Sequence, residues 1–163
     1  MNHYKIAVWD SQQRFIDSDK AKMEYFLKKI LSPQLIEIDG IANLGNETFD
    51  LLIASANHLD SHAFVTWMNG LCKKMESEHI WTPALIMRSS NFDDLVEVYE
   101  KAAASNWYFD IIDPDHLESL PLRIANLLRI HDHIKELKKY DIEVSALKAR
   151  VDDLETSLKP SKS

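Results

Sequence analysis

The stretch FDLLIA, from Phe49 to Ala54, decides the fold. Every residue after Asp50 in it is apolar, so it lacks the alternation of a strand that has one face in water. A short, continuous apolar run is typical of a strand buried on both faces, as in parallel sheets covered by helices. The stretch therefore predicts an α/β domain.

Four other segments predict strands of the same sheet. They are Tyr4 to Trp9, Leu35 to Ile38, Thr82 to Met87 and Trp107 to Ile112. Apolar residues at helical spacing predict helices that begin at about Ser18, Ala63, Asn91 and Pro121, with at most one turn between Ile41 and Thr48. Since parallel strands are joined by right-handed crossovers, we expect a doubly wound, five-stranded parallel sheet.

Three of these helices carry an apolar stripe that we expect to face the sheet. In the helix over about Ala63 to Glu76, where an aromatic stripe favours core over a ligand platform, the stripe comprises Phe64, Trp67, Met68, Leu71 and Met75. After Asn91 it comprises Leu95, Val96, Tyr99 and Ala102 or Ala103. After Pro121 it comprises Leu122, Ile124, Leu127 and Leu128.

The last helix continues into a second pattern, with alternating spacings of three and four. We name these residues the seam: Ile130, His133, Leu137, Tyr140, Val144, Leu147, Val151, Leu154 and Leu158. β-branched residues at a with Leu at d favour a parallel, two-stranded coiled coil. A single heptad would suit a helix lying on its own domain, but four heptads span about 43 Å, more than the width of a small domain.

Flanking charges agree with a parallel pair. Glu143 would face Lys148 of a second copy, and Arg150 would face Glu155, although Glu136 would face Asp141 as a mismatch. We therefore predict a homodimer. Residues 1–129 would form the domain, residues 130–159 the coiled coil and residues 160–163 a flexible tail.

Composition narrows the function classes. The 163 residues include 26 Asp and Glu against 19 Lys and Arg, a net charge of -7, which argues against direct nucleic-acid binding by this segment. No apolar stretch reaches the roughly 18 residues of a membrane span, and the first residues do not read as a secretory leader. The single cysteine, Cys72, excludes a disulfide within the chain, and we expect it to be buried. We expect cytoplasmic residence and no membrane association.

Glycine is scarce where a phosphate-binding loop would need it. The chain holds only Gly40, Gly45 and Gly70, and none follows the first strand. Backbone N–H groups approach a phosphate closely only in glycine-rich loops, so neither dinucleotide binding nor P-loop hydrolysis is supported. His131 and His133 point to different helix faces, which argues against a shared metal site. We expect no cofactor and no metal.

Four segments resemble, in order and spacing, the receiver domain of bacterial response regulators. They are KIAVWD from Lys5 to Asp10, FDLLI from Phe49, TPALIM from Thr82 to Met87, and the Asp113-Pro114 exit. The resemblance covers Tyr4 to Arg129. It implies a flavodoxin-like sheet with strand order 2-1-3-4-5 and a role in two-component signalling.

The residues that take up phosphate in that family are mostly replaced here. In the family, two acids after the first strand hold magnesium, an aspartate ending the third accepts phosphate, a Thr or Ser ends the fourth, and a lysine follows the fifth. The matching positions here are Asp10 and Ser11, Ser55, Arg88 with Ser89 beside it, and Asp113. Ser55 cannot form an acyl phosphate, and Asp10 with two hydroxyls is a poor magnesium cage. These six residues predict a vestigial phosphorylation pocket without a catalytic residue.

Arg88 is the one cation at these predicted strand ends. We expect it to pair with Asp10 or Asp113 as a permanent substitute for the metal, or else to point to solvent, where an ion pair contributes little. The family's aromatic position on the fifth strand falls on Asp110.

The sequence thus predicts a non-enzymatic signal-transduction module. Its pseudo-receiver would act independently of phosphorylation, dimerise, and regulate an attached output domain, such as that of a transcription activator or a cyclic-nucleotide signalling enzyme. One alternative is a stand-alone adaptor that docks a kinase or another regulator. Another is a receiver phosphorylated at a nonstandard residue, for example Asp60.

Overall fold

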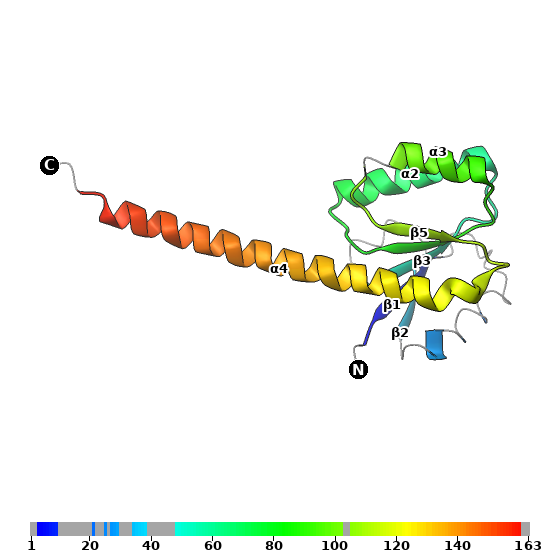
Figure 1. Ribbon diagram of the computed structural model, residues 1–163, viewed down its shortest axis with the longest axis horizontal. Coiled ribbons are helices and arrows are strands. Elements are labelled where there is room, and N and C mark those ends of the chain that lie inside the picture. Colours follow the sequence, from blue (N-terminus) through cyan, green and yellow to red (C-terminus); the bar gives the residue numbers. More distant parts are fainter. Residues whose placement is uncertain are drawn as a thin grey trace. The chain divides into compact units, whose positions relative to one another are not determined.

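The structure, a computed structural model, describes residues 3–9, 21, 25, 27–29, 34–38, 48–102 and 105–160. The chain divides into two compact units, Met1–His131 and Asp132–Ser163. The first unit contains a parallel sheet in the strand order β2-β1-β3-β4-β5 (Figure 1). The strands are β1 Lys5–Trp9, β2 Gln34–Ile38, β3 Leu51–Ser55, β4 Ala84–Met87 and β5 Phe109–Ile112. The expected parallel α/β sheet is confirmed.

The helices begin and end close to their predicted bounds. They are α2 Ser61–Ser77, α3 Phe92–Ala102, the 3-10 helix η2 Leu117–Ser119 and α4 Leu120–Leu158. The helix start predicted at about Asn91 is confirmed. Asn91 caps α3, because its side-chain oxygen accepts a hydrogen bond from the Asp94 amide at 2.8 Å. The predicted helix from Ser18 and the turn after Ile41 lie largely outside the described residues.

Strand side chains alternate between two apolar clusters, one on each face of the sheet. The first cluster joins alternate strand residues to α2 and α3, and includes Ala7, Leu52, Ala54, Ala84, Ile86, Phe64, Met68, Leu71, Met75 and Val98. The second joins the intervening strand residues to α4, and includes Ile6, Val8, Leu51, Ile53, Leu85, Met87, Leu120, Ile124, Leu127 and Leu128. Figure 1 shows α2 and α3 together over one face of the sheet. Helices therefore cover both faces.

Helix α2 buries the stripe that its sequence predicts. Phe64, Met68, Leu71 and Met75 are at most 1% exposed, and Trp67 packs partly against the same cluster. Cys72 is buried, as expected.

Helix α3 presents a different side to the sheet from the predicted one. Only Asp94 and Val98 of this helix are buried. Leu95, Val96 and Tyr99 are exposed, so their predicted inward placement is wrong, and only Ala102 of that stripe packs partly against the core. The reason is a charged contact of Asp94, described below.

One further expectation fails on α4. Leu122 is 63% exposed, although Ile124, Leu127 and Leu128 are buried as predicted. Ile130 is half-buried and packs against the second cluster. The first residue of the predicted seam therefore belongs to the body of the domain.

At the outer edge of β5, side chains occupy the backbone groups of Ile111. The Asp110 carboxylate accepts hydrogen bonds from the Ile111 amide at 2.8 Å and from the Arg123 guanidinium at 2.6 Å. Arg123 also donates to the Ile111 carbonyl at 3.1 Å. Both backbone groups of Ile111 are thus occupied.

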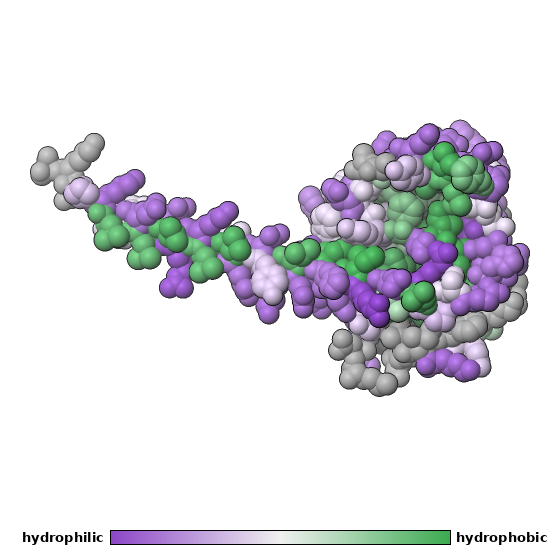
Figure 2. All heavy atoms as spheres, viewed as in Figure 1, coloured by the Kyte–Doolittle hydropathy of each residue, from purple (hydrophilic) through white to green (hydrophobic). Residues whose placement is uncertain are grey.

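The second unit consists of the rest of α4 and the residues that follow it. Within it, every apolar seam residue is exposed, namely Leu137, Tyr140, Val144, Leu147, Val151, Leu154 and Leu158. Figure 2 shows apolar residues running along this segment among polar ones. None of the helices in the described ranges is long and apolar enough to cross a membrane.

Candidate functional site

The carboxyl ends of three neighbouring strands are held level by backbone hydrogen bonds. The Ala56 amide, just after β3, donates to the Met87 carbonyl at 3.0 Å, and the Arg88 amide, just after β4, donates to the Ile112 carbonyl at 2.9 Å. The carboxyl ends of these strands therefore bring together, as predicted, Ser55, Arg88, Ser89 and Asp113. Asp10 and Ser11 lie outside the described residues.

Arg88 is buried at this end of the strands, with 6% of its surface exposed. Its Nη1 donates to the Ala56 carbonyl at 3.0 Å and also to the Leu59 carbonyl, both in the loop between β3 and α2. Its Nη2 lies 3.6 Å from a carboxylate oxygen of Asp94 on α3. Its guanidinium carbon stands 4.3 Å from the centre of the Phe64 ring on α2. One side chain thus ties β4 to a loop and two helices.

Asp94 is as unusual as Arg88, because only 7% of this acidic residue is exposed. The same carboxylate oxygen that faces Arg88 accepts a hydrogen bond from the Ser61 hydroxyl at 3.1 Å, in the first turn of α2. Arg88, Asp94 and Ser61 form a polar cluster beneath α2 and α3, which we name the Arg88 cluster.

Strand alternation explains why Arg88 turns toward these helices. Ile86 points to the α2 and α3 face and Met87 to the α4 face, so the next residue returns to the α2 and α3 face. Asp94 of α3 is the carboxylate that meets it there. The predicted pairing of Arg88 with Asp113 is wrong, and so is the alternative that Arg88 points to solvent.

A buried guanidinium is costly unless carbonyls, a carboxylate or an aromatic face replace its water. The Arg88 cluster supplies all three. The exception is Nε, which is buried without a hydrogen-bond partner among the described residues. The cluster is therefore a fixed internal charge pair whose rupture would leave Asp94 buried and unpaired.

Ser89 and Asp113 make a separate, exposed polar contact. The Ser89 hydroxyl donates to the Asp113 carboxylate at a long 3.4 Å, and the Ser89 amide donates to the Asn57 side chain at 3.0 Å. The other oxygen of Asp113 accepts the Asp115 amide at 2.8 Å, which shapes the turn after β5. Asp113 thus serves local structure at the end of β5.

The sequence reasoning missed Asp94, Ser61 and Asn57. Asp94 lies in the first turn of α3, where the helix dipole makes acidic residues common, so its position alone does not mark it as a buried partner. The signal that could have found it is Arg88 itself, because an arginine that follows a buried strand and points inward needs a carboxylate nearby.

The described part of the chain offers no group of three or more His, Cys, Asp or Glu side chains that could hold a metal ion. Its one cysteine, Cys72, is held in the thiol form, since burial raises its pKa more than a hydrogen bond with the Ser105 side chain lowers it. Neither observation includes Asp10, which lies outside the residues that the structure describes.

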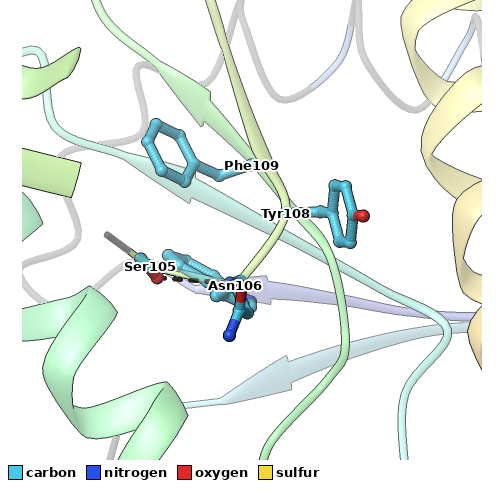
Figure 3. Close-up of a pocket in the computed structure, with 5 residues that line it drawn as sticks. Ser105, Asn106, Tyr108 and Phe109 are labelled. Carbon is cyan, nitrogen blue, oxygen red and sulfur yellow. Dashed lines mark hydrogen bonds between the residues drawn. The ribbon is translucent and has the colours of Figure 1, made fainter. Parts of the chain in front are cut away.

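A shallow pocket of about 230 Å³ lies at the amino end of β5, lined by residues 105–109 (Figure 3). The Trp107 indole donates to the Thr82 carbonyl at 2.7 Å, and the Trp107 amide donates to the Ser105 hydroxyl at 3.2 Å. Figure 3 shows Tyr108 and Phe109 pointing to opposite sides of the strand. The lining carries no charged side chain, and the Arg88 cluster lies at the other end of the strands.

Comparison with known proteins returned structural likenesses alone. No protein-family model matches this sequence, and no curated protein matches it. The receiver domain of the histidine kinase CKI1 from Arabidopsis thaliana, complexed with Mg2+ and BeF3-, is 14% identical over 76% of this chain and 89% of its own, with a TM-score of 0.49. The chemotaxis protein CheY4 of Vibrio cholerae is 15% identical over 79% of this chain and 99% of its own, with a TM-score of 0.45.

A CheY-like response regulator receiver domain protein from Methanospirillum hungatei is also 15% identical, over 81% of this chain and 98% of its own, with a TM-score of 0.48. These likenesses concern the arrangement of strands and helices, and no residue role follows from them.

Proposed function

We propose that the chain is a non-enzymatic signalling module: a receiver-like domain that works without phosphorylation, dimerises through a parallel coiled coil, and regulates an attached output domain. The observation that carries the proposal is the buried Arg88. In the receiver resemblance this position belongs to a hydroxyl that responds to phosphate. Here it holds a permanent cation fixed by two carbonyls and Asp94.

The contacts of Arg88 favour a static domain. A phosphate-driven switch needs a group at the end of β4 that is free to move toward new negative charge. Moving Arg88 would break its hydrogen bonds to the Ala56 and Leu59 carbonyls. It would also leave the buried Asp94 carboxylate of α3 without its charge partner. Ser55, at the end of β3, offers a hydroxyl in place of the carboxylate that forms an acyl phosphate.

Asp60, the nonstandard acceptor considered above, is engaged in local structure. It is the N-cap of α2, and its carboxylate accepts a hydrogen bond from the Ala63 amide at 2.7 Å. Capping of α2 therefore accounts for an acidic residue at this position.

Incubation with acetyl phosphate and magnesium, followed by intact-mass measurement, tests this part of the proposal. We expect no gain of a phosphoryl group. Asp60→Asn and Asp50→Asn are matched variants, because both remove one carboxylate. A gain in mass in the wild type that disappears only in Asp60→Asn would replace our reading with that of a working receiver.

The dimer is supported by the exposed seam of the second unit. Seven apolar residues recur there at spacings of three and four, and all are exposed in the single chain. Ile142 is also apolar and 71% exposed, but it lies outside the seam. This gives a matched pair of substitutions on one helix.

Sedimentation equilibrium of three forms tests the dimer. We expect the wild type and Ile142→Glu to be dimers, and the Leu147→Glu/Leu154→Glu variant to be a folded monomer, because charges at d positions would be buried in the coil. A seam variant that stays dimeric at low concentration would show that another surface joins the two copies.

A further inference from the structure

Helix α3 exposes a row of apolar side chains that the domain leaves uncovered. Phe92, Leu95, Val96 and Tyr99 are 78%, 40%, 36% and 73% exposed. Their spacing of three, four and seven residues places them on one side of the helix. We name this row the α3 stripe. Figure 2 shows apolar residues at the surface in the region that α3 occupies in Figure 1.

The stripe cannot turn inward at low cost. The opposite side of α3 is anchored by Asp94 to Arg88 and Ser61, and by Val98 in the first cluster. Rotating the helix would bring Asp94 out and leave the Arg88 guanidinium without its carboxylate. The domain therefore holds two aromatic and two aliphatic side chains in water, a feature that marks interaction sites.

The charges beside the stripe select its partner. Asp93, Glu97 and Glu100 are all exposed on α3, and Lys101 of the same helix is paired with Glu97 at 2.9 Å. The border of the stripe is thus negative. A second copy docking stripe to stripe would bring carboxylates against carboxylates, which is unfavourable. A partner with Lys or Arg beside its apolar face would be attracted.

We propose that the α3 stripe is the docking site for an amphipathic helix with basic flanks from a different protein. A helix presents anchors at the same three, four and seven spacing, so its apolar face can pack along the stripe. Its basic residues would then lie against Asp93, Glu97 and Glu100. This inference goes beyond the proposed function and does not depend on the coiled coil.

Titration of the full chain with labelled synthetic peptides tests the proposal. The probe is a helix of about 14 residues, or four turns, with leucines at the anchor spacing and lysines elsewhere. One control peptide replaces every lysine by glutamate, and another scrambles the leucine and lysine order. We expect the patterned basic peptide to bind at least about tenfold more tightly than either control.

Paired variants locate the binding. Phe92→Ser/Tyr99→Ser should weaken binding of the basic peptide at least about tenfold, because exposed aromatic anchors carry much of such contacts. Tyr25→Ser/Leu122→Ser removes two apolar residues that are also exposed, but lie outside α3, and should leave binding unchanged. Circular dichroism and thermal unfolding confirm that each variant folds.

A second pair tests the charge argument. Glu97→Gln/Glu100→Gln should weaken binding severalfold, while Asp152→Asn/Asp153→Asn, which removes the same charge from the end of α4, should not. The proposal is overturned if the glutamate peptide binds as well as the basic one, or if the Phe92/Tyr99 variant binds like the wild type. It is also overturned if the wild type forms assemblies that the Phe92/Tyr99 variant abolishes, since the occupant would then be a second copy.

Discussion

Helices α2 and α3 lie on the same face of the sheet (Figure 1), yet the apolar side of α2 faces the sheet and that of α3 faces solvent. α2 buries six residues, and all of them are apolar or cysteine. α3 buries an aspartate and a valine and leaves its apolar stripe exposed. Apolar residues at helical spacing therefore show that one face of a helix is apolar. They do not show whether that face points to the sheet or to solvent. A single strong buried contact can decide the rotation of a short helix.

The same substitution on both helices should have very different effects on stability. Phe64→Ala should lower the free energy of unfolding by about 3–5 kcal/mol, because it empties a fully buried site beneath Arg88. Phe92→Ala should change it by no more than about 0.5 kcal/mol, because the ring is already in water. Urea unfolding measures both. Similar losses at the two positions would mean that the α3 stripe is covered in solution.

A second test removes the Arg88–Asp94 contact, which fixes the rotation of α3. Arg88→Met keeps most of the apolar stem but leaves Asp94 buried and unpaired, so we expect a loss of about 3 kcal/mol. Adding Asp94→Leu should restore much of that stability, because the stranded charge is gone. A loss below about 1 kcal/mol for Arg88→Met would show that the ion pair does not hold the helix.

The smallest expected effect concerns the Cys72 thiol of α2. Burial raises its pKa above the value in the unfolded chain, so the folded state favours the protonated thiol. The associated stability is complete below the unfolded pKa and is lost as the pH rises through the folded pKa. The loss cannot exceed about 1.4 kcal/mol per pH unit.

Unfolding in urea between pH 7 and pH 10, compared with Cys72→Ala, measures this loss. The variant should show the flatter dependence on pH. Equal slopes for the two proteins would assign the alkaline loss to other groups.

The parallel sheet and most helix bounds could be predicted from sequence because they depend on local signals. The continuous apolar run of β3, the Asn91 cap and the absence of a breaker after Pro121 each act within a few residues. The rotation of α3 could not be predicted in this way, because it depends on Arg88 and Asp94 meeting across a strand and a helix. At Ile130 the heptad pattern and the core pattern overlap, and in the single chain this residue packs partly against the second cluster.

The candidate site was predicted in position but not in its contacts. Ser55, Arg88, Ser89 and Asp113 were placed together because parallel strands end at a common edge. The prediction that Arg88 pairs with Asp113 was wrong, because the partner of Arg88 depends on which face of the sheet its side chain occupies. A one-residue change in register reverses that face.

The occupied backbone groups of Ile111 at the outer edge of β5 affect how copies of this chain can associate. Edge strands with free backbone groups invite pairing with a strand from another molecule. With Asp110 and Arg123 occupying both groups of Ile111, continuation of one sheet into another is blocked at that residue. Amyloid-like stacking and strand exchange are disfavoured along this side, and helix surfaces remain the more accessible route to assembly.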